Sequence, residues 1–282
     1  MMRHLEGLAP IADDYDGFIL DLWGVIHDGR KLLPHSKATL EALRARGKRI
    51  VMLSNAPRRA EMAAKGLTRL GIPPELYDGV MTSGENVWEA LRTRDDPFYA
   101  KLGRRVFFLG PPRDLPLIEG LDLDLALTPA EADFVLNVGA DEGINDRDLA
   151  PHLPALEACL AAKLPMVCAN PDLIIVRDGE QIICAGLLAE HYARMGGEFR
   201  WRGKPSPEVY GPTLAMLGVA PERVLAVGDA LRTDIAGAET AGLASCWVLD
   251  GIHDLAGKHD LAEQEATAAG LAPLATLPSF RW

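Results

Sequence analysis

Cysteines are few in this sequence of 282 residues, and their spacing excludes two kinds of site. The four are Cys159, Cys168, Cys184 and Cys246. No two of them have the short spacing of a metal-binding or disulfide-rich framework. None is followed six residues later by arginine, so the phosphate-binding loop of cysteine-dependent phosphatases is absent. We expect four small buried thiols in a reducing cytoplasm.

Long apolar runs and an excess of positive charge are also missing. No apolar run approaches the roughly 18–20 residues that cross a bilayer. The acidic stretch Asp13–Asp16 near the start of the chain is unlike a secretory signal peptide. The 40 Asp and Glu residues outnumber the 29 Lys and Arg residues, giving a net charge of −11. This balance argues against general nucleic-acid binding but permits a local phosphate site, so we expect neither a nucleic-acid nor a membrane partner.

Apolar residues make up 48% of the chain and charged residues 24%, which is typical of a globular protein. The length predicts about two domains. Strand-like and helix-like runs alternate, which predicts an α/β fold with a doubly wound parallel sheet. The predicted core elements are the strands Gly17–Leu22, Lys48–Leu53, Arg223–Val227 and Leu243–Leu249 and the helices Pro34–Arg46, Arg58–Leu70, Pro207–Leu217 and Thr233–Ala241.

The middle of the chain predicts a second α/β domain inserted into the first. Its expected strands are Arg105–Leu109, Phe134–Val138, Met166–Ala169 and Leu173–Val176, and its expected helices are Glu85–Arg92 and Arg147–Ala162. Asp178-Gly179 predicts a hairpin turn. We place the core at residues 1–83 and 197–282 and the inserted domain at residues 84–196. The expected hinges are Ser83-Gly84 and Gly196-Gly197.

Polar residues that suit phosphate chemistry lie at the ends of the predicted core strands or at the start of helices. They are Asp21, Ser54, Asn55, Lys204, Asp229 and Asp234. In an open parallel sheet, ligands bind beyond the carboxyl ends of the strands. Carboxylates hold Mg²⁺, lysine and hydroxyl groups bind phosphate oxygens, and a carboxylate can attack phosphorus. Each residue alone also suits a cap, a turn or a solvated surface, but the set favours a Mg²⁺-dependent phosphoryl-transfer site.

Four short motifs resemble those of the haloacid dehalogenase (HAD) superfamily. They are Asp21-Leu22-Trp23-Gly24-Val25-Ile26, Ser54-Asn55, Gly203-Lys204-Pro205, and Gly228-Asp229 followed by Thr233-Asp234. The insertion, with Thr82-Ser83-Gly84 at its start and Ala169-Asn170-Pro171-Asp172 inside it, is similar to the cap domain of the type-IIA branch. That branch includes nitrophenyl, nucleotide and pyridoxal phosphatases. The resemblance implies a Rossmann-like core and hydrolysis of a small phosphorylated metabolite through a phospho-aspartate.

The resemblance also implies a Mg²⁺ cofactor and its ligands. Asp21 would both attack phosphorus and bind the metal. The backbone carbonyl of Trp23 and the carboxylate of Asp229 would be further direct ligands, and Asp234 would act through water. Phosphoryl transfer depends mainly on positioning the reacting groups and on neutralising the negative charge spread over the phosphoryl oxygens. Metal ligands of this kind suit that reaction.

A second set of residues would bind the substrate. They are Ser54, Asn55, Arg58, Asn170, Asp172 and Lys204. The resemblance implies that Ser54 and Asn55 hold the transferring phosphoryl group, while Lys204 neutralises charge on phosphate and nucleophile. Arg58 could hold an anionic substrate tail or be solvated. The loop of Asn170 and Asp172 could touch substrate or form a plain turn.

One position departs from the family pattern. The second residue after the nucleophile is usually an aspartate that protonates the leaving oxygen, and here it is Trp23. A general acid contributes about 10²–10⁴ in rate, so we expect low activity. His27 lies four residues further on and is a candidate replacement, with an exposed structural role as the alternative.

Two other functions remain open. A catalytically weak member of the superfamily could bind a phosphorylated ligand for regulation, and Trp23 in place of the usual aspartate would be the cause of its weak activity. A flavodoxin-like receiver or binding domain is disfavoured, because such domains carry neither the inserted domain nor the spacing from Lys204 to Asp229. We also expect that a homodimer could form through the cap.

Overall fold

The computed structural model describes residues 2–177, 179–253 and 255–282, which divide into two compact units. The first unit contains Met1–Ser54, Glu61–Met81 and Lys204–Trp282. The second contains Asn55–Ala60 and Thr82–Gly203. The chain therefore crosses between the units four times.

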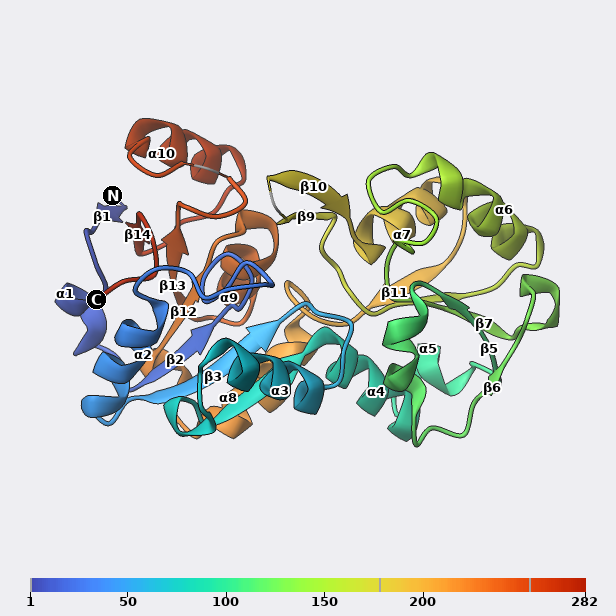
Figure 1. Ribbon diagram of the computed structural model, residues 1–282, viewed down its shortest axis with the longest axis horizontal. Coiled ribbons are helices and arrows are strands. Elements are labelled where there is room, and N and C mark those ends of the chain that lie inside the picture. Colours follow the sequence, from blue (N-terminus) through green and yellow to red (C-terminus); the bar gives the residue numbers. More distant parts are fainter. Residues whose placement is uncertain (1, 178, 254) are drawn as a thin grey trace. The chain divides into compact units, whose positions relative to one another are not determined.

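The first unit is built on a seven-stranded sheet in the order β1-β14-β13-β12-β2-β3-β4 (Figure 1). Its strands are β1 (Arg3–His4), β2 (Gly17–Leu20), β3 (Arg49–Ser54), β4 (Gly79–Thr82), β12 (Val224–Gly228), β13 (Ala244–Val248) and β14 (Ala275–Leu277). Central β2 pairs in parallel with β3 on one side and β12 on the other. All four residues of β2 are buried, as expected for a parallel strand covered on both faces.

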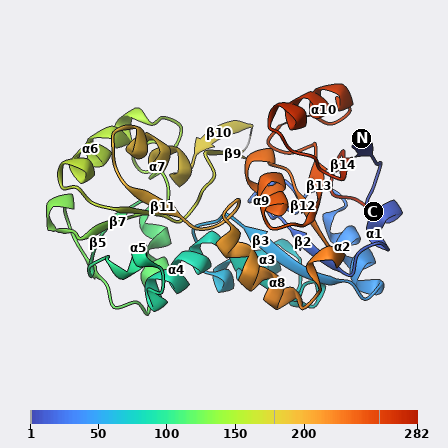
Figure 2. The ribbon, with the colours of Figure 1, turned by 180° about the vertical axis from the view of Figure 1, so that it is seen from behind.

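Helices follow the strands of this unit as in a doubly wound fold. They are α1 (Ala9–Ala12), α2 (Ser36–Ala45), α3 (Ala60–Leu70), α8 (Tyr210–Leu217), α9 (Ala236–Thr240) and α10 (His259–Ala268). Helices α8 and α9 lie beside the sheet (Figure 2). Leu217 of α8 and Ala238 of α9 belong to one buried cluster with Ile19, Val51 and Val224 of the sheet. The predicted α/β fold class is confirmed.

The second unit has a sheet of its own, in the order β11-β8-β7-β5-β6, and an antiparallel hairpin of β9 and β10. The strands are β5 (Arg105–Leu109), β6 (Asp124–Leu125), β7 (Phe134–Asn137), β8 (Met166–Cys168), β9 (Ile174–Arg177), β10 (Glu180–Ile183) and β11 (Phe199–Trp201). The helices are α4 (Ser83–Thr93), α5 (Pro97–Ala100), α6 (Leu153–Ala161) and α7 (Ala185–Arg194). The predicted hairpin is present, although Asp178 of its turn lies outside the described residues.

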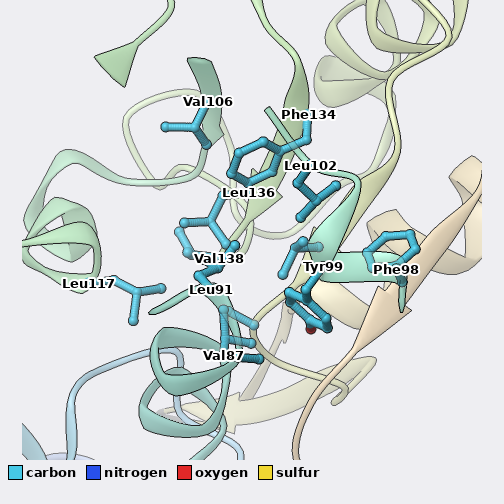
Figure 3. Packing of buried hydrophobic residues seen from close by; sticks show 13 residues of the cluster. Val87, Leu91, Phe98, Tyr99, Leu102, Val106, Leu117, Phe134, Leu136 and Val138 are labelled. Carbon is cyan, nitrogen blue, oxygen red and sulfur yellow. The ribbon is translucent and has the colours of Figure 1, made fainter. Parts of the chain in front are cut away.

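Alternate residues of β7 pack into two buried clusters, one on each face of the second unit's sheet. Phe134 and Leu136 point to the side of α4 and α5, where they meet Val87 and Tyr99 (Figure 3). Val135 faces the other side, in a cluster with residues of α6 and α7. The period of two along a strand therefore builds a three-layer α/β/α unit.

Three details differ from the sequence-based prediction. The return to the first unit comes after Gly203 and not at Gly196-Gly197, because β11 first pairs with β8. The helix expected from Arg147 begins only at Leu153, with Pro154 in its first turn. The helix expected from Thr233 begins as a π-turn, Leu231–Ile235.

The four cysteines are buried, as predicted, and none of these described thiols forms a disulfide. None of the helices in the described part of the chain has the length and apolar character needed to cross a membrane.

Truncating the buried side chain of Leu136 should strongly destabilise the second unit. Leu136→Ala leaves a cavity in a fully buried cluster, which typically costs about 2–5 kcal/mol. Leu127→Ala is the matched control, since Leu127 is 88% exposed and its loss should cost less than about 0.5 kcal/mol. Urea unfolding measures both. Equal effects of the two substitutions would contradict the packing described for this cluster.

Candidate active site

Three carboxylates meet at the carboxyl edge of the first unit's sheet. Asp21 follows β2, and Asp229 follows β12, which pairs directly with β2. Asp234 lies in the π-turn after β12, a helical form often found at functional sites. One ligand oxygen from each of the three lies within 4.8 Å of the others, and all three residues are buried.

Lys204 is placed between two of these acids. Its ammonium donates to Asp21 Oδ1 at 2.5 Å and to Asp234 Oδ1 at 2.6 Å. Burial alone lowers the pKa of Lys204, but the two carboxylates outweigh burial and raise that pKa well above its usual range. Lys204 is therefore an ammonium ion.

The three acidic side chains share one buried site with the Lys204 ammonium, which bonds Asp21 and Asp234. Burial raises the pKa of Asp21 well above its usual value; Lys204 opposes this shift, and the charges of Asp234 and Asp229 reinforce it. Three acidic side chains so close together offer the oxygen donors that a hard divalent cation takes.

Backbone groups hold the Asp229 carboxylate in one orientation. The N–H of Ile252 donates to Asp229 Oδ2 at 2.9 Å, and the indole N–H of Trp247 donates to the backbone oxygen of Asp229 at 2.9 Å. A Cβ at Gly24 would lie 2.1 Å from Asp229 Oδ2, and one at Gly251 would lie 2.3 Å from it. Only glycine fits at either position.

Asp234 is enclosed in a similar way. The backbone N–H of Ala230 donates to Asp234 Oδ2 at 3.0 Å, and a Cβ at Gly228 would lie 2.1 Å from Asp234 Cγ. The sequence motifs contained Gly24 and Gly228, but nothing local pointed to Trp247, Gly251 or Ile252. These residues belong to β13 and the loop after it, and their role depends on the pairing of β13 with β12.

The loop after Asp21 carries Trp23 and His27. The indole of Trp23 lies on Gly29, where a Cβ would be 2.3 Å from its Cη2 atom, and meets the His27 ring edge-on at 5.9 Å. His27 Nδ1 accepts the Gly29 N–H at 3.0 Å. Burial lowers the pKa of His27, and Asp28 partly opposes this shift. Because Nδ1 accepts the Gly29 N–H, the nitrogen left to donate a hydrogen bond is Nε2.

The other predicted residues fall into two places. Ser54 is buried at the end of β3, next to β2 in the first unit. In the second unit, Asn55 Nδ2 donates to Asp172 Oδ1 at 2.8 Å, and Asn170 Oδ1 accepts the Asp172 N–H at 3.0 Å. Arg58, also in the second unit, is half exposed and paired with Asp114 at 2.9 Å.

Comparison with known proteins identifies the family. A family model described as haloacid dehalogenase-like hydrolase matches residues 18–124, and a second, HAD-hydrolase-like, matches residues 201–274. A haloacid dehalogenase-like hydrolase from Brucella suis is 30% identical, with a TM-score of 0.85 over 98% of this chain and 99% of its own.

Two further proteins are similar over most of their length. The p-nitrophenyl phosphatase of Archaeoglobus fulgidus shares the fold, with a TM-score of 0.71 and 24% identity over 94% of this chain and 97% of its own. The glycerol-3-phosphate phosphatase of Gallus gallus is 28% identical over 96% of this chain and 92% of its own. The expectation of a HAD-type enzyme is confirmed, and this chain belongs to the haloacid dehalogenase-like hydrolase family.

Proposed function

We propose that the protein is a Mg²⁺-dependent phosphatase that hydrolyses small phosphorylated metabolites through a phosphoryl group carried on Asp21. The observation that carries this proposal is the buried cluster of three acidic side chains around the Lys204 ammonium, at the carboxyl edge of the sheet. Family membership and the phosphatase names of its relatives support it. A cytoplasmic location and a homodimer stay predictions.

Asp21, Asp229 and Asp234 would hold the cation, with the Trp23 carbonyl as a further ligand. When bound, Mg²⁺ would neutralise charge on the transferring phosphoryl group. The geometry supports this assignment, because backbone N–H groups and three glycines already fix two of the three carboxylates.

The reaction then depends on residues that the fold brings to one edge of the sheet. A carboxylate oxygen of Asp21 forms a bond to phosphorus, and the substrate's leaving oxygen departs with its bonding electron pair. Lys204 holds Asp21 and offsets the charge of the phosphoryl oxygens, while the Ser54 hydroxyl donates to one of them. Water then attacks the acyl phosphate, which releases inorganic phosphate and restores Asp21.

The loop after Asp21 contains few groups that could protonate the leaving oxygen. Between Asp21 and Arg30, the ionisable side chains are His27 and Asp28. His27 Nδ1 accepts the Gly29 N–H, and Asp28 Oδ1 accepts the backbone N–H groups of Arg30 and Lys31 at 2.9 Å each. These bonds favour a loop-ordering role for His27, or donation of a hydrogen bond from Nε2, over transfer of a proton. The alternative function, a regulatory phosphate binder, rests on the same observation.

Replacing the nucleophile should abolish turnover. Asp21→Asn removes the attacking oxygen anion, so release of p-nitrophenol from p-nitrophenyl phosphate should fall to background, a loss of at least about 10⁴-fold. Asp14→Asn, which alters an exposed carboxylate of the same unit, is the control and should have wild-type activity. Wild-type activity in Asp21→Asn would show that another group attacks phosphorus. A wild type that binds phosphate but never releases p-nitrophenol would favour the regulatory alternative.

Metal binding should be visible without any turnover. At 100 times its dissociation constant, Mg²⁺ should add about 2.7 kcal/mol to stability, because it binds only the folded cluster. Asp229→Asn removes one negative charge and one ligand, so it should reduce the response to Mg²⁺. Thermal unfolding with EDTA or Mg²⁺ measures both effects. An Asp229→Asn protein that responds to Mg²⁺ like the wild type would place the metal elsewhere.

The leaving group should control the rate. With an indole at position 23, an alkoxide gets little proton assistance, whereas p-nitrophenolate needs none. We expect kcat/KM to be higher for p-nitrophenyl phosphate than for glycerol 3-phosphate by about 10²–10³-fold. Trp23→Asp should reduce this ratio, and Trp23→Phe, which supplies no acid, should leave it high. If the wild type hydrolyses both substrates equally well, another residue supplies the proton.

A further inference from the structure

The segments in which the chain crosses between the two units are tied together within the second unit. Gly203, the last residue before one crossing, lies against Asn55 and Ser83, which lie at or next to two others. A Cβ at Gly203 would be 2.7 Å from Asn55 Oδ1 and 2.8 Å from Ser83 Cβ. With a φ of +111°, Gly203 also has a backbone that favours glycine. The Ser83 hydroxyl donates to the Arg202 carbonyl.

The segment Asn55–Ala60 is bound equally closely to the start of α4. The Gly84 N–H donates to the Ala56 carbonyl at 3.1 Å, and a Cβ at Gly84 would lie 2.5 Å from the Arg58 nitrogen. The Glu85 carboxylate accepts the Ala60 N–H at 2.9 Å. We call these segments, Asn55–Ala60, Thr82–Glu85 and Arg202–Gly203, the crossing bundle.

Asp172 contacts the crossing bundle from the loop between β8 and β9. Its Oδ1 accepts from the carboxamide of Asn55 at 2.8 Å, and Asn55 is only 3% exposed. The backbone of Asp172 is itself fixed, since its N–H donates to Asn170 Oδ1 at 3.0 Å and its carbonyl accepts the Gly186 N–H at 3.0 Å. A Cβ at Gly186 would lie 2.5 Å from that carbonyl oxygen. The carboxylate therefore reaches Asn55 from a residue whose backbone N–H and carbonyl are both hydrogen-bonded.

We propose that Asp172 is a positioning residue for the active site. By holding the Asn55 side chain against Gly203, it fixes two backbone segments whose next residues are Ser54 and Lys204. The inference rests on the proposed function, in which Ser54 and Lys204 hold the phosphoryl group. It also revises the expected role of Asp172, because its carboxylate is bonded to the crossing bundle and so need not touch substrate.

The first test needs no turnover. Asp172→Ala should increase hydrogen exchange of the backbone amides in residues 55–60, 82–85 and 202–204, while exchange in the β5–β7 part of the sheet stays unchanged. Asp172→Asn keeps an acceptor oxygen and should restore protection. Asp146→Ala is the matched control, because Asp146 is a carboxylate of the same unit whose partner is Arg177 of β9, at 2.6 Å. Unchanged exchange in Asp172→Ala would overturn the proposal.

The second test is kinetic. Asp172→Ala should lower kcat by about 10- to 100-fold, because small displacements of catalytic groups have effects of this size, with little change in KM. The loss should be the same for p-nitrophenyl phosphate and glycerol 3-phosphate. Asn55→Ala combined with Asp172→Ala should lose no more than the more damaging single change. A raised KM that differs between substrates would instead make Asp172 a direct substrate contact.

The two tests separate the possible failures. If the wild type hydrolyses no phosphate ester, the proposed function fails, while the exchange measurement still decides whether Asp172 orders the bundle. If the wild type is active and Asp172→Ala is equally active, the positioning role is wrong and the proposed function stands.

Discussion

The site depends on the burial of Lys204 between two carboxylates. Taking an ion out of water costs several kcal/mol, and the attraction of a close partner offsets that cost only when the geometry is good. Lys204 meets Asp21 at 2.5 Å and Asp234 at 2.6 Å, so its own charge is well compensated. The same ammonium bonds two of the three acids that meet at this edge of the sheet. The loops around the site keep the three acids close together, as a bound divalent cation would require.

The same constraint explains why glycines surround the acids. A buried carboxylate is stabilised by hydrogen bonds, and backbone N–H groups supply them only if the backbone comes very close. Ala230 and Ile252 make such bonds to Asp234 and Asp229. Gly228 and Gly251 lie where any side chain would overlap these carboxylates. The close approach of backbone to carboxylate and the need for glycine therefore have one cause.

Much of this arrangement could be predicted from local sequence patterns. Asp21 directly follows the apolar run of β2, and Asp229 directly follows that of β12. The carboxyl ends of parallel strands lie at one edge of the sheet, so the sequence alone placed both acids at that edge. Gly251, Ile252 and Trp247 could not be found in this way, since they approach Asp229 only through strand pairing. The bond from Asp172 to Asn55 joins residues 117 positions apart, and an Asn-Pro-Asp sequence equally predicts a simple turn.

The residue at which the chain returns to the first unit could not be predicted from composition. Gly196-Gly197 has the composition of a hinge, but each glycine has a local reason to be there. Gly196 has a φ of +96°, which suits the residue that ends α7, and a Cβ at Gly197 would lie 2.2 Å from the Tyr192 ring. Glycine is common both at helix ends and at hinges. Only the pairing of β11 with β8 shows that Gly196-Gly197 ends a helix and is not the hinge.

The loop of Trp23 shows how packing and chemistry compete for the same few side chains. Trp23 supplies a ring that covers Gly29, while His27 and Asp28 accept backbone N–H groups that order the turn. Each bond that shapes the loop uses a group that could otherwise have moved a proton. Catalysis here would then rest on charge neutralisation at the edge of the sheet, with no proton transfer from this loop. Under the proposed function, such a site would favour substrates whose leaving groups are already stable as anions, so the architecture of one loop would limit the chemistry of the substrate.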